Sequence, residues 1–268
     1  MDSSPTRLRR LAEETNLKEV YRHKAWRYTS FKPSGRDTTL EEKLLTLFEQ
    51  ISAIPRPSGS EERIGHYLLA FAHRCGLASV RDAFHNVVIE KKAAAGREND
   101  PGIFVQAHMD MVCEKNSDSS HDFEKDAIQV VRGGDFLSAK GTSLGADNGI
   151  GMAMLLRLLE EDFANPRVVA IFTADEERGL GGVKNLDLSP YGDIDVLVNL
   201  DSEEEGVFFS SCAGGVRCRL ALPVLWARYQ KSEDTKQLSI VVKGLSGGHS
   251  GLAIDCERAN AILFSSLQ

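Results

Sequence analysis

Hydrophobic positions follow two different spacings along the chain from about residue 40 onward. The stretch LEEKLLTLFEQISAI (40–54) repeats apolar residues every three or four positions and stops at Pro55, which is the pattern of an amphipathic helix. A second helix is predicted over 61–75, because Ser58 and Glu61 have the spacing of a capping box ahead of it. The spacing therefore predicts that two amphipathic helices open the folded part of the chain.

Short apolar runs rich in valine and isoleucine predict β-strands: NVVIEK (86–91), GIFVQA (102–107), RVVAIFTA (167–174) and DVLVNL (195–200). The last three lack polar alternation, as strands buried on both faces do. Between them, 148–161 predicts a mostly buried helix, and 130–141 predicts a hairpin that turns at Gly133–Gly134. Strands that alternate with helices predict an α/β fold, with a mainly parallel sheet and flanking helices.

The two ends of the chain differ from this central part. Residues 1–38 carry nine Lys or Arg against five acids and are interpreted as an N-terminal extension, since a mitochondrial presequence would be poor in acids. The main domain is expected over 39–214. Beyond it, residues 215–268 contain two strand-like stretches and one helix-like stretch, so they predict the beginning of a second, α+β domain.

Composition narrows the function classes. A net charge of −7 and a pI near 5.6 argue against nucleic acid or an anionic membrane as the main partner and favour a small molecule. Five scattered cysteines without a close pair indicate neither a disulfide framework nor a thiolate zinc site. No apolar stretch reaches the roughly 18 residues of a membrane span, and the cytoplasm is the expected location.

Acidic and imidazole side chains follow the predicted strands or begin the central helix: His108, Asp110, Asp147, Glu176, Glu177 and Asp201. Taken singly, each motif has an ordinary structural explanation, such as a solvated turn or a helix entry with Asp147 as N-cap. Together they occupy the carboxyl ends of core strands, where open α/β sheets build their sites. Such a cluster would repel itself unless cations were bound, and histidine with carboxylates suits zinc, manganese or cobalt.

Six stretches resemble, in order and spacing, the co-catalytic zinc metallopeptidases of family M20: QAHMDMV, GTSLGADNGIGMA, FTADEERGLGG, NLDSEEEG, CAGG and GLSGGHSG. The residues of the stretches VCEKN, LGADNGIG and LDSEEEG are similar to those of the aminoacyl-histidine dipeptidase branch of this family. The resemblance implies a zinc aminopeptidase-like fold with an inserted lid and dimerisation domain. It also implies two divalent metal ions, hydrolysis of Xaa-His and other unblocked dipeptides, a homodimer formed through the lid, and a cytoplasmic location.

The resemblance also implies the metal ligands. His108 and Asp201 would each bind one ion, Asp147 would bridge the two, and Glu177 would be a further ligand.

Three residues would act on the reaction instead. Asp110 would accept a hydrogen bond from the second ring nitrogen of the liganding histidine. Glu176 would be the general base, and His249 would stabilise the oxyanion of the tetrahedral intermediate.

One departure from the family pattern concerns the second metal site. The family has a further histidine ligand after its lid domain, and these 268 residues include no such position. A truncated product or fragment of a dipeptidase, a non-catalytic relative that binds peptides or proteins, and a partial gene model are all compatible with this. An aminoacylase of the same superfamily is the alternative within the enzymes. The chain by itself is expected to have little dipeptidase activity and to bind less metal than full-length relatives.

Overall fold

The computed structural model describes residues 38–134, 136–192, 194–202, 206–211, 221–223, 225, 239–246 and 256–266. The chain divides into two compact units, Met1–Cys212 and Ala213–Gln268. His249, like residues 1–37, lies outside the described residues.

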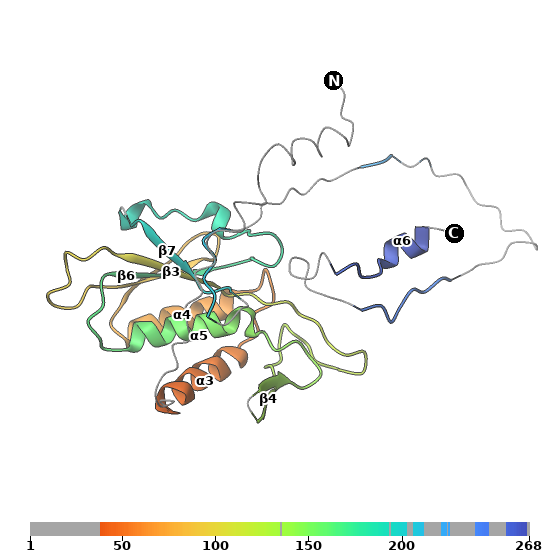
Figure 1. Cartoon of the computed structure of the whole chain (residues 1–268), viewed down its shortest axis with the longest axis horizontal. Coiled ribbons are helices and arrows are strands. Elements are labelled where there is room, and N and C mark those ends of the chain that lie inside the picture. Colours follow the sequence, from red (N-terminus) through yellow and green to blue (C-terminus); the bar gives the residue numbers. More distant parts are fainter. Residues whose placement is uncertain are drawn as a thin grey trace, which may run out of the picture. The chain divides into compact units, whose positions relative to one another are not determined.

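The first unit is built on a five-stranded sheet in the order β1–β2–β6–β3–β7 (Figure 1). The strands are β1 (Ala78–Arg81), β2 (Val87–Lys91), β3 (Ile103–His108), β6 (Val168–Thr173) and β7 (Val196–Asn199). The α/β class is confirmed, but the sheet is mixed. β3 runs parallel to β6 and β7, whereas β2 runs antiparallel to β1 and β6. The exposed strand β1 was missed, and its short connection to β2 forces an antiparallel pair.

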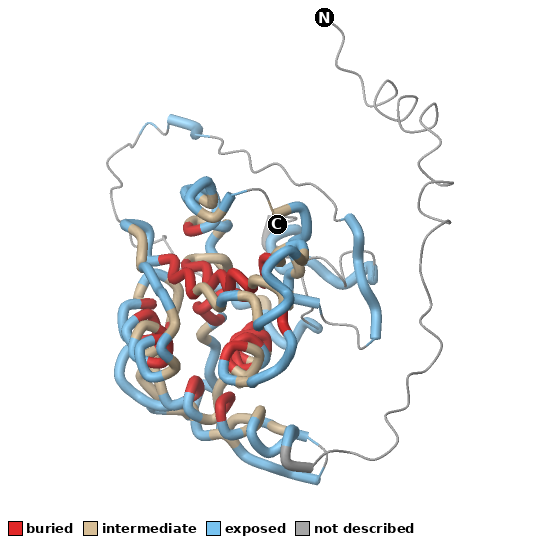
Figure 2. The backbone as a smooth tube through the Cα atoms, turned by 90° about the vertical axis from the view of Figure 1, so that its left-hand side faces the viewer, coloured by how far each residue is buried: buried red, intermediate tan, exposed pale blue. Residues whose placement is uncertain are grey.

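Two helices cover one face of this sheet, and a third helix packs on the outer side of one of them (Figure 1). α4 (Glu62–Arg74) packs on β1 and β2, α5 (Ala146–Glu160) packs on β3, and α3 (Thr38–Ser52) packs on α5. Because α5 lies between the sheet and α3, it is buried on most sides, as its nearly continuous apolar sequence predicts. In Figure 2 the buried positions gather along the sheet and the inward sides of the helices.

The opposite face of the sheet is covered by residues that follow β6 in sequence, in a segment that contains the short 3-10 helices η1 (Val183–Asn185) and η2 (Ser189–Tyr191). Leu186, Leu188, Tyr191 and Ile194 pack there on the buried side chains of Val88, Phe104, Val169 and Ile171. All six residues of β6 are buried, as expected for a central strand.

Strand β7 differs from the expectation of burial on both faces. Val196 is 46% exposed and Leu197 is 55% exposed. The reason is that β7 pairs only with β3 among the described residues, so it forms an edge of the sheet there.

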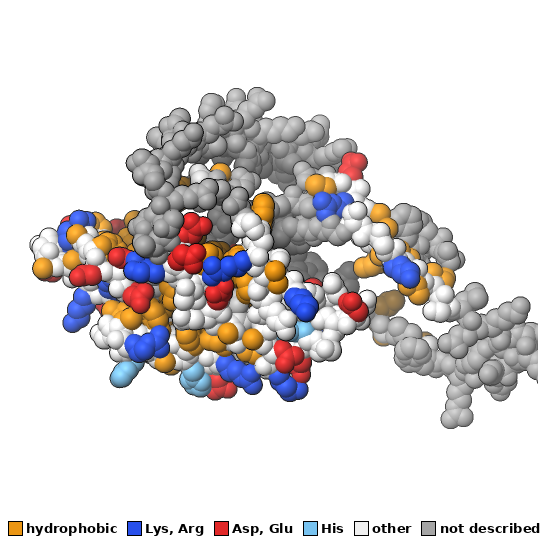
Figure 3. Space-filling view, turned by 90° about the horizontal axis from the view of Figure 1, so that it is seen from below, with side chains coloured by type: hydrophobic (Ala, Val, Ile, Leu, Met, Phe, Trp, Pro, Cys, Tyr) orange, Lys and Arg blue, Asp and Glu red, His pale blue; other side chains and the backbone are white. Residues whose placement is uncertain are grey.

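The remaining elements lie outside the sheet. β4 (Val130–Gly133) and β5 (Phe136–Ala139) form the predicted hairpin, with Gly133 opposite Phe136. In the second unit, α6 (Ala261–Ser266) is shorter than the predicted helix, and the described residues 239–246 contain no strand. No helix of the described residues is both long and apolar enough to cross a bilayer. On the face drawn in Figure 3, acidic and basic side chains are interspersed.

Candidate metal centre

The parallel strands β6, β3 and β7 end at the same edge of the sheet. His108 is the last residue of β3 and lies opposite Thr173, the last residue of β6. The turn after β6 carries Glu176 and Glu177, and Asp201 follows β7 by two residues. Because parallel neighbours deliver their carboxyl ends together, the chain brings these side chains to one rim.

Four oxygen atoms surround the imidazole of His108, which is buried. Nε2 lies 2.8 Å from Asp147 Oδ1 and 3.7 Å from Asp201 Oδ1. Nδ1 lies 3.1 Å from the main-chain carbonyl oxygen of Asp110 and 3.4 Å from its carboxylate. The ring therefore links residues that follow two different strands to the beginning of α5.

This environment favours a cation at the position of the ring. Burial alone lowers the pKa of His108, but the neighbouring carboxylates of Asp110, Asp147 and Asp201 outweigh it and raise the pKa to about 12. In the metal-free chain the imidazolium itself thus neutralises part of the surrounding negative charge.

The fully buried Asp110 carboxylate connects the two strand ends. It accepts hydrogen bonds from the amides of Glu176 (3.0 Å) and Glu177 (3.2 Å), and from Ser58 Oγ (2.7 Å). Burial opposes ionisation, but hydrogen bonds from His108, Ser58 and the Glu176 amide lower the pKa of Asp110 to about 2. Asp110 is thus ionised at neutral pH and holds the turn after β6 against the end of β3.

A tight turn after β6 presents the two adjacent glutamates. Asp175 has a φ of +55°, in the left-handed region, and its amide donates a hydrogen bond to Glu61 Oε1. The turn closes at Gly182, where a Cβ would lie 2.8 Å from Ala174 N and closer still to its carbonyl oxygen. Only glycine leaves room for the backbone to return so close to the strand end.

The two glutamates share a raised pKa but differ in their contacts. Burial is the largest cause for both; repulsion from nearby carboxylates, Asp147 among them, also raises the two pKa values, and His108 opposes this rise. Glu177 Oε1 is buried without a hydrogen-bond partner among the described residues. Glu176 instead borders a pocket of about 130 Å³ that Thr173, Asn199 and Asp201 also line, which is room for a few water molecules.

The first turn of α5 positions Asp147. Gly145 adopts a φ of +69° ahead of the helix, and the side chain of Asp147 remains 54% exposed. The side chain that caps this helix is that of Asn148, whose Oδ1 accepts a hydrogen bond from the backbone amide of Gly151 over 3.1 Å. Asp147 points instead to His108, so the N-cap explanation for Asp147 is wrong.

Two sets of side chains bring their possible ligand atoms within 4.8 Å of one another: His108 with Asp147 and Asp201, and His108 with Glu176 and Glu177. One imidazole and several carboxylates are a donor set that suits divalent metal ions, and the buried Glu177 Oε1, which has no hydrogen-bond partner among the described residues, is free to act as a ligand. The residues therefore fit bound metal.

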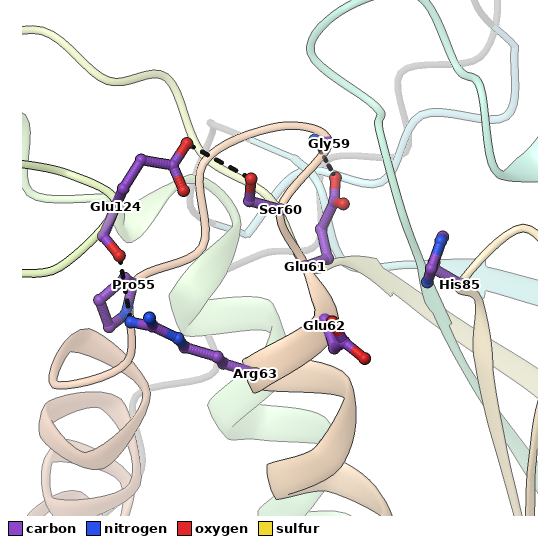
Figure 4. Close-up of a pocket in the computed structure, with 8 residues that line it drawn as sticks. All are labelled: Pro55, Gly59, Ser60, Glu61, Glu62, Arg63, His85 and Glu124. Atoms are coloured by element: carbon purple, nitrogen blue, oxygen red, sulfur yellow. Dashed lines mark hydrogen bonds between the residues drawn. The ribbon is translucent and has the colours of Figure 1, made fainter.

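Glu61, Asp110 and Asp175 form a third group of close carboxylates, but hydrogen bonds within the fold explain the position of Glu61. Glu61 Oε1 accepts hydrogen bonds from the backbone amides of Gly59 and Asp175, so this carboxylate stabilises the turn after β6. Figure 4 shows the carboxylate of Glu61 turned back toward Gly59.

The capping box expected from Ser58 and Glu61 is wrong. Neither side chain caps α4: Ser58 bonds to Asp110, and Glu61 holds the turn after β6. Arg56, whose buried side chain bonds to the backbone at Met109, Asp110 and Gly145, was not predicted from the sequence. An arginine between two prolines, in the break between two amphipathic helices, was the available signal.

Comparison with known proteins places these features in context. Residues 104–212 match the model of a protein family that is described as "Peptidase family M20/M25/M40". The cytosol non-specific dipeptidase of Escherichia coli (strain K12) is 40% identical over 221 residues, which cover 82% of this chain and 45% of that relative. The chain thus spans about half the length of this curated relative.

Solved structures give the same fold. The aminoacylhistidine dipeptidase of Vibrio alginolyticus is 42% identical with a TM-score of 0.58, over 61% of this chain and 33% of that one. A tripeptidase of Staphylococcus aureus, 24% identical with a TM-score of 0.51 over 60% of this chain and 43% of that one, shares the fold.

Proposed function

The chain belongs to peptidase family M20/M25/M40. We propose that its activity is the metal-dependent hydrolysis of dipeptides with free termini, including Xaa-His dipeptides. The observation that carries this proposal is the convergence of His108 with Asp147, Asp201 and the glutamate pair at one edge of the sheet. The names of the E. coli and V. alginolyticus relatives supply the substrate class.

The proposed ligands are the residues whose donor atoms surround His108. His108, Asp147 and Asp201, whose ligand atoms lie within 4.8 Å of one another, would hold one ion together, which replaces the expectation that His108 and Asp201 hold different ions. Asp147 would also reach a second ion, to which Glu177 would contribute its unpaired oxygen. Bound zinc, manganese or cobalt would supply Lewis-acid activation of water and of the scissile carbonyl.

Glu176 is the proposed general base. Its carboxylate borders the pocket beside Asp201, and burial raises its pKa, which brings its proton affinity closer to that needed at neutral pH. It would accept a proton from the attacking water and donate it to the leaving amine as the peptide C–N bond breaks. Asp110 would fix the orientation of the His108 ring.

Further parts of the proposal concern His249, the second unit and the cellular location. His249 would stabilise the oxyanion, the second unit would contribute to a lid and a homodimer interface, and the location would be cytoplasmic, as in the name of the E. coli relative.

The test is removal and restoration of metal. The purified chain is treated with a chelator, reloaded with zinc, manganese or cobalt, and analysed for bound metal and for cleavage of an Xaa-His dipeptide. Metal binding that depends on His108 supports the proposed centre. Little cleavage by these 268 residues alone is the expected result, whereas metal-dependent cleavage would support the proposed activity and overturn that expectation. Cleavage that survives complete metal removal would refute the mechanism, and cleavage of N-acetylated amino acids in preference to dipeptides would support the aminoacylase alternative.

A further inference from the structure

Arg56 lies in the connection between α3 and α4, and its side chain is among the largest fully buried ones in the described chain. Burial of a guanidinium is costly unless its N–H groups find acceptors. Nη1 and Nη2 find acceptors in main-chain carbonyls on two separate segments that carry proposed metal ligands, whereas Nε has no hydrogen-bond partner among the described residues.

The first segment is the end of β3. Arg56 Nη1 donates to the carbonyl of Met109 over 2.9 Å and to that of Asp110 over 3.0 Å. These residues directly follow His108. The neighbouring Pro57 forms a β-bridge with Met111, which continues the contact along the same segment.

The second segment is the beginning of α5. Arg56 Nη2 donates to the carbonyl of Gly145, two residues before Asp147. A Cβ at Gly145 would lie 2.6 Å from this nitrogen, and one at Gly149 would lie 2.8 Å from it. Glycine at both positions lets the helix backbone close directly on the guanidinium.

The geometry points to Arg56 as a positioning residue that fixes Asp147 against His108, and with it the metal site. A planar guanidinium can bond carbonyls in two directions at once, which a lysine ammonium on a flexible stem does not reproduce. Asp110, Asp147 and Glu177 favour its positive charge, and the pKa of Arg56, although lowered by burial to about 10, keeps it protonated at neutral pH. This inference rests on the proposed function only in naming the metal ions as what the fixed geometry serves.

The test compares Arg56→Met with the wild-type chain and with Arg132→Met. Arg132 is a matched control, because it lies on the exposed β4–β5 hairpin and also pairs with two groups, the carboxylates of Glu42 and Glu49. Hydrogen exchange of the metal-free chains should show at least about tenfold faster exchange for Arg56→Met in peptides covering 109–111 and 145–151, with β1 and β2 unchanged. Cobalt affinity should fall about 10–100-fold, as it does when groups that orient ligands are lost. Arg132→Met should change neither.

The two proposals fail in different ways. A wild-type chain that binds no cobalt refutes the proposed function, and the exchange measurement on metal-free protein still decides the role of Arg56. Unchanged local exchange in Arg56→Met would overturn the inference. If Arg56→Met does not fold, Arg56→Lys decides: the same local loosening despite the retained charge supports the inference, and wild-type exchange overturns it.

Discussion

The amide of Glu176 donates a hydrogen bond to the Asp110 carboxylate over 3.0 Å, although the two residues follow different strands. Asp110 therefore sets the position of the proposed base by holding its backbone and leaves the glutamate side chain available. The same carboxylate lies beside His108, so one buried group orients both sides of the site.

We expect Asp110→Asn to weaken both the fold and metal binding. The asparagine keeps one acceptor oxygen but turns an NH2 donor toward the amide of either Glu176 or Glu177, and a buried donor left without its acceptor costs about 1–3 kcal/mol. Denaturant unfolding and cobalt titration measure the two effects. The exposed Asp118→Asn is the control, and equal unfolding free energies for the two variants would contradict the prediction.

Substitution of the adjacent glutamates should separate two functions. Glu177→Gln should lower metal affinity at least about tenfold, because Glu177 offers the buried unpaired oxygen. Glu176→Gln should leave metal content near that of the wild type, and in any form of the protein that cleaves dipeptides it should lower turnover about 10²–10⁴-fold. Elemental analysis and kinetics check this, and indistinguishable variants would show that the assignment is wrong.

The metal-free chain should lose stability as pH rises from 6.5 to 8.5. The folded-state pKa of His108, about 12, lies above its ordinary value of 6.5. Its contribution is therefore complete below pH 6.5 and decreases as pH rises toward 12, by up to about 1.4 kcal/mol per pH unit. Burial raises the pKa of the Cys75 and Cys113 thiols, so both stay neutral in this range.

Urea unfolding of chelator-treated protein at several pH values measures this slope. His108→Gln should remove it, and saturating zinc should reverse it, since metal competes with the proton for the ring. A metal-free wild-type chain whose unfolding free energy stays constant or increases over the range would rule the prediction out.

Gly182→Ala should disturb the turn that carries the glutamates. Its φ is ordinary for any residue, so the penalty comes from the added methyl group against the backbone of Ala174, about 1–3 kcal/mol. Gly133→Ala is the matched control, because a Cβ there meets no atom within 4 Å. Thermal unfolding of both variants tests the difference; equal melting temperatures would mean that the turn adjusts without cost.

The sequence predicted the ends of the central strands because three short apolar runs stop directly before polar residues. His108 and the pair Glu176–Glu177 could be placed at one rim on that basis alone. The edge position of β7 could not be predicted, since its apolar run is indistinguishable from that of a buried strand. Arg56 was missed because a buried cation becomes recognisable only when its carbonyl acceptors, 53 to 89 residues away, are known.

Strand β6 has a consequence for how the chain folds. It lies between β2 and β3, both of which precede it in sequence, so these two strands have no direct partner in each other. During synthesis the sheet cannot close, and the edge that carries His108 cannot be completed, until residues 168–173 have emerged. Such pairing between distant segments slows folding relative to local contacts, so the exposed edges of β2 and β3 are the surfaces at risk of misassociation before β6 inserts.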